Sequence, residues 1–348
     1  MTRSVSMVAI GSVLAVGQVA AAADPAEKTP PVITVSGLLV GNYTVSLTED
    51  AAGDVPLDNS FNLDRTYVKV DAKLTDALST RVTLDSGRES VQTVVDASGA
   101  SIVVPEDLRY RVFVKHAWLE WKASSDVSIK GGMVDTVLIP FQENFTGLRW
   151  IGKLFLDELR LETTTDLGVN VSGKHGKGRV SWAAGVYNGE TFIAPEAGSG
   201  KSLQARVTVD PLTGEGKKVS MPISVFIDEN LQQDDVPGVL TWAGNVGFKH
   251  PNFLFLGEVV GRSFDGVSGL GQGIQIIPRV PDVGFLLVRL DRLDPNTDVA
   301  DDGVMRILAG PGHDFYDKVS LALLYDRYMY EASDIPAHGV VLKAQAGF

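Results

Sequence analysis

Basic side chains recur at alternate positions in three segments of the chain, near 61–75, 79–87 and 109–123. The residues of this set are Arg65, Lys69, Lys73, Arg81, Arg109, Arg111 and Lys115. Only Asp71 and Asp85 share their positions in the alternation. Period-two spacing puts such residues on one face of a sheet, and rings of Arg and Lys favour anions in a pore. The pattern therefore predicts an anion-attracting surface; the alternative is that these bases pair with acids and select nothing.

Residues that make or break bonds show no comparable grouping. A catalytic nucleophile needs a base held beside it, and none of the five histidines lies in a metal-ligand spacing such as H-E-x-x-H. The run from Gly269 to Gly273 lacks the spacing and the following helix of a dinucleotide-binding fingerprint. We therefore expect no catalytic residue, no cofactor and no metal, so the chain is not predicted to be an enzyme.

Acidic residues outnumber basic ones by 43 to 31, and the formal net charge is −12. This balance argues against a nucleic-acid partner, which would require a basic face. The pairs Asp234-Asp235 and Asp301-Asp302 carry oxygens of the kind that divalent cations prefer. Because no twelve-residue calcium loop accompanies them, solvated acidic loops are the favoured interpretation. Cysteine is absent, which excludes disulfides.

The first 23 residues have the features of a cleaved export signal. Arg3 precedes a mostly apolar stretch, and three alanines before Asp24 provide a small-residue cleavage site. Polar interruptions argue against a membrane anchor, and no stop-transfer flank follows. The predicted division of the chain is a signal peptide (1–23), a short periplasmic segment (24–31) and a single barrel domain (32–348).

The remainder of the chain alternates between apolar and polar residues, which is typical of β-strands. Sixteen strands are predicted, although fourteen or eighteen would also fit. They lie near 32–47, 61–75, 79–87, 109–123, 126–138, 166–174, 178–188, 201–210, 218–227, 239–250, 253–263, 270–280, 283–290, 303–312, 318–330 and 337–348.

The connections between these strands alternate in length, which a soluble β-sandwich does not require. The longer ones are predicted at 48–60, 88–108, 139–165, 189–200, 228–238, 264–269, 291–302 and 331–336. A transmembrane barrel has short periplasmic turns at one rim and long external loops at the other. In hydrocarbon a sheet must also close on itself, because its backbone groups find no water. The fold class is therefore all-β, an antiparallel transmembrane barrel in the outer membrane of a Gram-negative-type bacterium.

The last strand alternates from Val340 up to the final residue, Phe348. This resembles the terminal strand that the outer-membrane assembly machinery recognises, and Phe348 is the expected assembly signal. The alternative is that an aromatic residue ends the chain by chance.

The stretch 131–189 resembles the porin family that includes the phosphate-selective porins O and P. The resemblance is carried by Gly131-Gly132-Met133, Pro140-Phe141-Gln142-Glu143, Asp166-Leu167-Gly168 and the hairpin strand that ends in Tyr187-Asn188-Gly189. Gln142 replaces the glycine that the family typically has in its turn. The resemblance implies a homotrimer, and a third external loop, 139–165, that folds into the barrel and narrows it.

Composition independently supports an inward third loop, because its many aromatic and aliphatic residues need a wall to pack against. The charged residues expected to face the channel are Arg149, Lys153, Asp157, Glu158 and Arg160. A short surface helix with ordinary ion pairs is the alternative for Asp157 and Glu158.

The other predicted loops contain 22 acidic and two basic residues. Exposed loop charges are screened beyond about 8 Å at physiological salt, whereas charges in a narrow lumen act on every passing ion. We therefore predict a porin that passes small hydrophilic solutes or ions by diffusion and prefers anions such as phosphate. The predicted partners are these solutes, outer-membrane lipid and the assembly machinery. The alternative function is a plugged barrel that serves in surface binding or adhesion through its acidic external loops.

Overall fold

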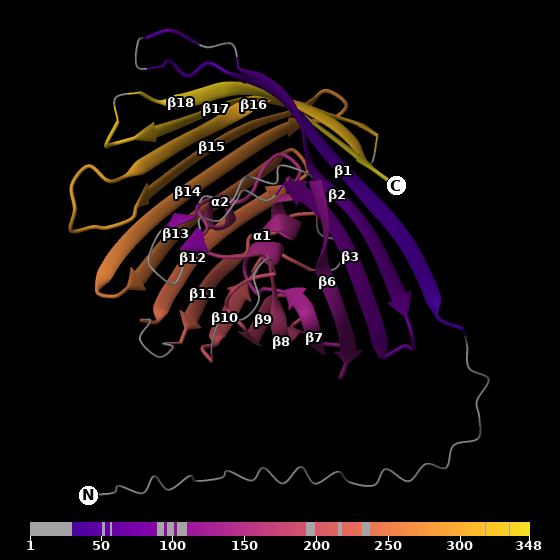
Figure 1. Cartoon of the computed structure of the whole chain (residues 1–348). Coiled ribbons are helices and arrows are strands. Elements are labelled where there is room, and N and C mark those ends of the chain that lie inside the picture. Colours follow the sequence, from indigo (N-terminus) through magenta and orange to yellow (C-terminus); the bar gives the residue numbers. More distant parts are fainter. Residues whose placement is uncertain are drawn as a thin grey trace, which may run out of the picture. The chain divides into compact units, whose positions relative to one another are not determined.

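The computed structural model describes residues 30–50, 53–55, 58–88, 94–95, 101–102, 110–192, 199–214, 218–231, 237–316, 318–333 and 335–348. Residues Pro31–Phe348 form one compact unit (Figure 1). The predicted signal peptide 1–23 lies outside the described residues, as do residues 24–29 and the predicted pore residue Arg109.

Sixteen antiparallel strands close into a barrel, which confirms the predicted fold class and strand number. The barrel strands are β1 (Val32–Ser46), β2 (Asn59–Lys73), β3 (Leu78–Arg88), β6 (Tyr110–Lys122), β7 (Val127–Asp135), β8 (Thr165–His175), β9 (Val180–Tyr187), β10 (Ser202–Val209), β11 (Ile223–Asn230), β12 (Val239–His250), β13 (Phe253–Phe264), β14 (Val267–Val280), β15 (Gly284–Asp294), β16 (Val304–Tyr316), β17 (Val319–Tyr330) and β18 (Ala337–Gly347). Strand β18 pairs with β1, so the sheet has no open edge. The short strands β4 (Val94–Val95) and β5 (Ser101–Ile102) pair only with each other.

The two faces of the barrel differ as period-two alternation requires. Along β15, Leu286 and Leu290 are exposed on the outer face, whereas Arg289 and Asp291 are buried inside. On β11 the outward side chain of Val225 is 62% exposed. An apolar outer face with polar side chains inside is the arrangement that a barrel in lipid needs.

The connection predicted as a long loop at 264–269 is a two-residue turn. Phe264 pairs with Val267, and the intervening Asp265 and Gly266 have φ values of 49° and 79°. Two successive positive φ angles make the type of turn that reverses a hairpin in two residues, and Asp-Gly is a preferred sequence for it. The prediction of a long loop here was wrong because it overlooked this turn.

Two strands extend further than predicted, and this moves acidic residues from the loops into the wall. Strand β11 begins at Ile223 rather than at 218 and continues to Asn230, and β15 continues to Asp294. Asp228 and Asp291, which were predicted in long loops, are therefore part of the barrel wall.

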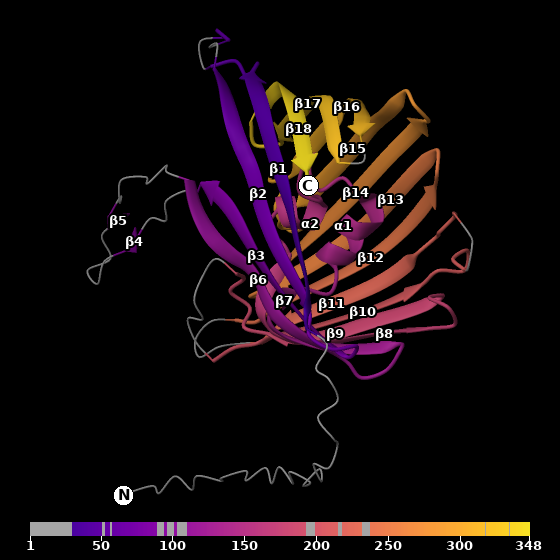
Figure 2. The same cartoon turned by 90° about the vertical axis from the view of Figure 1, so that its right-hand side faces the viewer.

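The connection between β7 and β8, residues 136–164, folds into the barrel, as predicted (Figure 2). We call it the inward loop. It carries the helices α1 (Ile139–Thr146) and α2 (Phe155–Glu158). Neither of these helices is long and apolar enough to span a bilayer, and the rest of the described chain contains no such helix either.

Candidate functional site

The inward loop is fixed along one side of the barrel, formed by strands β10 to β17, which we call the docking wall. Loop residues Leu148, Trp150 and Ile151 are buried there among apolar side chains that point inward from the wall. The wall residues of this contact are Leu254, Ile277, Phe285, Leu287, Leu308, Ala322 and Leu324. Burial of this apolar surface fixes the loop inside the barrel.

Two aromatic rings of the loop lie directly over glycines of the docking wall. A Cβ atom at Gly247 in β12 would lie 2.5 Å from Cζ of Phe145. A Cβ atom at Gly271 in β14 would lie 2.6 Å from Cζ of Phe155, which is 1% exposed. A larger side chain at either position would displace the ring above it. Glycine at these two positions therefore allows the loop to lie close to the wall.

Two arginines of the docking wall hold backbone carbonyls of the loop. Arg206 Nε donates to the Val137 carbonyl at 2.8 Å, and its guanidinium lies 3.8 Å from the ring centroid of Phe141. Arg289 Nη1 donates to the carbonyl of Lys153 while Nη2 pairs with Asp291 at 2.7 Å.

A third arginine of this wall binds a carboxylate of the loop. Arg306 Nη1 lies 3.5 Å from Glu158, and Nη2 pairs with Asp326 at 2.8 Å. The hydroxyl of Tyr328 donates to Glu158 at 2.7 Å. Glu158 therefore faces the docking wall and departs from the predicted channel-facing position, because the wall supplies its hydrogen-bond donors.

The opposite side of the barrel, strands β2, β3 and β6, carries the predicted basic residues, and we call it the basic wall. Its centre is Tyr67, whose ring centroid lies 5.3 Å from Lys69 Nζ and 5.1 Å from Lys115 Nζ. Lys115 also donates to the Tyr67 hydroxyl at 2.8 Å, and Arg65 donates to the same hydroxyl. Three predicted residues thus meet at one phenol, which lies on the same inward face at the intervening position.

Other predicted bases of this wall have carboxylate partners. Arg81 Nε pairs with Asp71 at 2.7 Å, and Arg65 lies 3.7 Å from Asp85. Lys73 pairs with Asp76 in the exposed turn after β2. Arg111 lies on β6 and is exposed. Within the described part of the chain, Lys69 and Lys115 have no carboxylate within ion-pair distance, and they contact aromatic rings and a hydroxyl.

A bulge in β6 changes which of its side chains point inward. The pairing with β3 shifts between Thr83 and Leu84, so that Thr83 pairs with His116 and Leu84 with Val114. Lys115 is buried inside, as predicted, but Trp118 is also buried inside and Ala117 is exposed. Continued alternation from Arg111 and Lys115 places Ala117 inside and both His116 and Trp118 outside; this prediction fails beyond the bulge because one extra residue reverses the parity.

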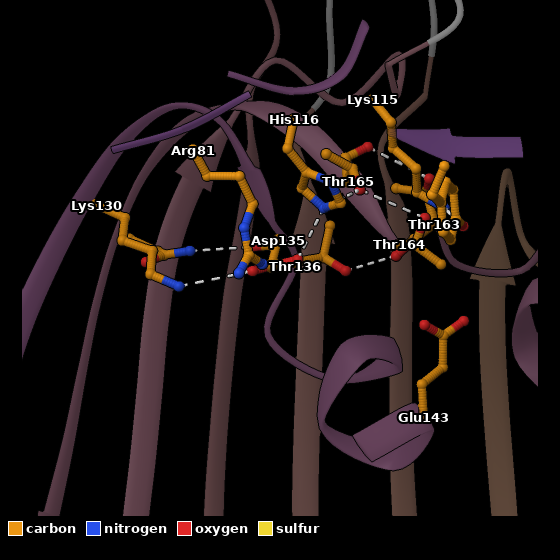
Figure 3. A network of polar contacts seen from close by, with 12 residues as sticks. Arg81, Lys115, His116, Lys130, Asp135, Thr136, Glu143, Thr163, Thr164 and Thr165 are labelled. Atoms are coloured by element: carbon orange, nitrogen blue, oxygen red, sulfur yellow. Dashed lines mark hydrogen bonds and ion pairs between the residues drawn. The ribbon is translucent and has the colours of Figure 1, made fainter. Parts of the chain in front are cut away.

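The bulge also brings His116 into a polar network next to the inward loop (Figure 3). Its Nε2 lies 3.0 Å from Asp135 Oδ1 and 3.3 Å from the hydroxyl of Thr165. Lys130 Nζ is 3.6 Å from the same Asp135 carboxylate. Both contacts of the imidazole use one nitrogen, whereas a catalytic relay needs opposite nitrogens. The network therefore links β6 to the end of β7 and the start of β8.

The charged side chains of the inward loop pair mainly with one another. Arg149 forms ion pairs with Glu143 and, at 2.8 Å, with Asp157. Lys153 Nζ lies 3.5 Å from Asp157, which is buried. Arg160 is exposed. In Figure 3 the carboxylate of Glu143 points from α1 toward the side of the lumen where Lys115 lies.

The loop carboxylates differ in acidity because their neighbours differ. Burial raises the pKa of Glu143, and the charges of Arg149, Lys115 and Arg65 oppose this effect only in part. Burial would also raise the pKa of Glu158, but the charge of Arg306 and the hydrogen bond from Tyr328 lower it below its ordinary value. Burial and the neighbouring Asp228 raise the pKa of Glu162 well above its ordinary value.

Tyr67, Glu143 and Glu162 are residues of this site that sequence reasoning missed. Tyr67 could have been found, because it alternates with Arg65 and Lys69 on the inward face. Glu143 and Glu162 had no such signal, since their positions depend on the path of the loop. Among the described residues, no group of three or more histidines and carboxylates is placed to hold a metal ion.

Solved structures share this architecture, although no protein-family model and no curated protein matches the chain. An anion-selective porin from Comamonas acidovorans has a TM-score of 0.61 at 12% identity, over 91% of this chain and 100% of that chain. OmpF of Salmonella typhi, in complex with daunomycin, has a TM-score of 0.62 at 10% identity, over 91% of this chain and 97% of that chain. A trimer form of OmpT, an outer-membrane protein of Vibrio cholerae, has a TM-score of 0.59 at 12% identity, over 92% and 100%.

These similarities show that the chain has the fold of outer-membrane porins. They do not single out the phosphate-selective porins O and P, so that resemblance stays a prediction.

Proposed function

We propose that this chain is a porin in the outer membrane of a Gram-negative-type bacterium, which passes small hydrophilic solutes by diffusion and prefers anions. The observation that carries the proposal is the division of charge across the lumen. The inward loop is bound to one wall with its own charges largely paired, whereas Lys69 and Lys115 on the opposite wall contact rings and a hydroxyl. Lys69 is partly exposed and Lys115 is buried beside it, so both positive charges lie at the lumen surface without a carboxylate partner among the described residues.

Local charge matters more here than the net charge of −12. Ions in the open solution beyond the rim are separated from the loop acids by more than a Debye length of about 8 Å. Inside a narrow lumen an ion passes close to the wall, where the effective dielectric constant is lower and unpaired charges act more strongly. The acids that β11 and β15 bring into the wall reduce this preference, but Asp291 is already paired with Arg289.

The remaining partners follow from the same proposal. The apolar outer face suits outer-membrane lipid, and a homotrimer accords with the trimer form of one protein of the same fold. Residues 1–23 would serve as the export signal. Phe348 would serve as the assembly signal; its backbone N–H and carbonyl form two hydrogen bonds with Gly37 of β1, each 3.1 Å long.

Planar-bilayer recording tests this function. Under a salt gradient we expect a reversal potential of the anion-selective sign. The double variant Lys69→Glu with Lys115→Glu should shift it toward cations, because each change replaces a positive with a negative charge on the basic wall. Lys318→Glu, in the exposed turn between β16 and β17, is the matched control and should change little.

Two results would count against this proposal. A cation-selective wild-type channel would overturn the anion preference. Absence of conductance from correctly folded protein would favour the alternative function, a plugged barrel used for surface binding through its acidic loops.

A further inference from the structure

A second long loop also places a side chain inside the barrel. Phe192, from the connection between β9 and β10, stacks on Phe113 of the basic wall, with ring centroids 5.6 Å apart and an angle of 26° between the planes. Lys115 Nζ lies 5.6 Å from the centroid of the Phe192 ring. We call Phe113 and Phe192 the aromatic shelf.

A buried carboxylate positions the start of this loop. Asp166, which is 2% exposed, accepts hydrogen bonds from the backbone N–H of Leu167 at 2.6 Å and of Gly189 at 2.8 Å. The backbone N–H of Thr191 donates to the same carboxylate. Phe192 therefore follows directly after a segment that is held in place, and its position on the shelf is determined by the fold.

The shelf is unusual for its location. The inward face of a water-filled barrel is expected to be polar, yet both rings are only partly buried there. Phe192 borders the ammonium group of Lys115, which shares the Tyr67 ring with Lys69. A stack that only anchored the loop would not require this proximity to a lysine without a carboxylate partner among the described residues.

We propose that the basic wall binds planar aromatic carboxylates, with the ring on the aromatic shelf and the carboxylate attracted by the partly exposed Lys69 and by the charge of the buried Lys115. This inference rests on the proposed function and names its solute class. An inorganic anion would use the lysines but gain nothing from the rings. A neutral aromatic solute would use the rings but leave the lysines without a partner. An aromatic carboxylate matches both, since stacked rings attract beyond their burial and an ammonium pairs with a carboxylate.

The test compares three monocarboxylates as inhibitors of chloride current through single channels: benzoate, cyclohexanecarboxylate and acetate. Benzoate and cyclohexanecarboxylate have similar size and the same charge, but only benzoate is planar and aromatic. We expect benzoate to inhibit at a concentration about two- to tenfold lower than cyclohexanecarboxylate, the range that ring stacking provides. Acetate should inhibit least.

Variants locate the effect. Phe192→Leu keeps an apolar side chain but removes the ring, and it should abolish the preference for benzoate over cyclohexanecarboxylate. Phe113→Leu should act in the same way and replaces the first variant if that one fails to fold. Phe315→Leu, at an exposed position in β16, is the control and should retain the preference.

Equal inhibition by benzoate and cyclohexanecarboxylate in the wild type would overturn the inference. A benzoate preference that survives both shelf variants would also overturn it and leave the shelf as a loop anchor. Failure of the proposed function is a different result, because a wild-type channel without anion preference shows it before any carboxylate is added.

Discussion

The docking wall and the basic wall carry the same kinds of basic side chain but use them in opposite ways. On the docking wall, Arg206, Arg289 and Arg306 each bind a carbonyl or a carboxylate of the inward loop. On the basic wall, Lys69 and Lys115 surround a phenol. The comparison shows that a count of inward bases does not measure selectivity, because Arg289 and Arg306 are paired with carboxylates and Arg206 is buried against the loop.

Packing separates the two walls in the same way. The docking wall buries apolar loop residues and seats Phe145 and Phe155 over glycines. The basic wall contributes one residue, Trp118 of β6, to the buried apolar cluster that contains loop residues such as Leu138 and Phe155, and its charges act on Glu143. The hydrogen bonds and most of the apolar contacts that hold the loop therefore lie on the docking wall.

The largest expected difference between the walls concerns loss of a single cation. Arg289→Met should lower the free energy of unfolding by about 3–5 kcal/mol, because it leaves the buried Asp291 carboxylate unpaired. Lys69→Met on the basic wall should lower it by about 1 kcal/mol or less, since its contact is a cation–π interaction at a partly exposed site. Urea unfolding of the barrel in detergent measures both changes. Similar losses for the two variants would contradict the comparison.

A methyl group added to the docking wall beneath the loop tests how tightly the loop packs there, with a smaller expected loss of stability. Gly271→Ala should destabilise the barrel by about 1–3 kcal/mol, because the new Cβ would overlap the ring of Phe155. It should also lower single-channel conductance as the loop moves into the lumen. Gly244→Ala, on a docking-wall strand where a Cβ meets nothing within 4 Å, is the control. If conductance stays constant in Gly271→Ala, the contact between Phe155 and Gly271 does not determine the position of the loop.

Much of the fold could be predicted from the sequence, because period-two alternation and loop length are local properties. The sixteen strands follow from them, whereas the inward third loop was predicted from its apolar composition and from the family resemblance. The predictions that were wrong concern features that depend on residues elsewhere in the chain. The bulge at Lys115 is fixed by the register with β3, and it moved His116 and Trp118 inside although their alternation placed them outside.

The candidate site was predicted less completely for a similar reason. The basic residues alternate, so their shared face was visible, but which of them keep an unpaired charge depends on cross-strand neighbours such as Asp71 and Asp85. In the sequence, Gly271 was considered only as part of a run that does not match a nucleotide-binding motif. Its contact with Phe155 could not be predicted, because that contact depends on the path of the loop.

The smallest expected effect tests the charge that the loop presents to the basic wall. Burial raises the pKa of Glu143, so this group takes up a proton at higher pH than an exposed carboxylate does. As pH falls below neutrality, Glu143 loses its negative charge before an exposed carboxylate does, and anion selectivity should increase. Glu143→Gln fixes the neutral state, so it should show the greater selectivity at pH 7 and a weaker dependence on pH.

Reversal potentials recorded between pH 7 and pH 5 measure this change, with Asp298→Asn, at an exposed position after β15, as the control. The same sign applies to stability. Because the folded chain binds the proton more tightly than the unfolded chain, lowering the pH through this range increases the contribution of Glu143 to folding. Glu143→Gln should remove that increase as well. A wild-type channel whose anion selectivity falls on acidification would contradict this prediction, since protonation of Glu143 can only make the lumen more positive. A Glu143→Gln channel with the same pH dependence as the wild type would show that another carboxylate controls the charge opposite Lys115.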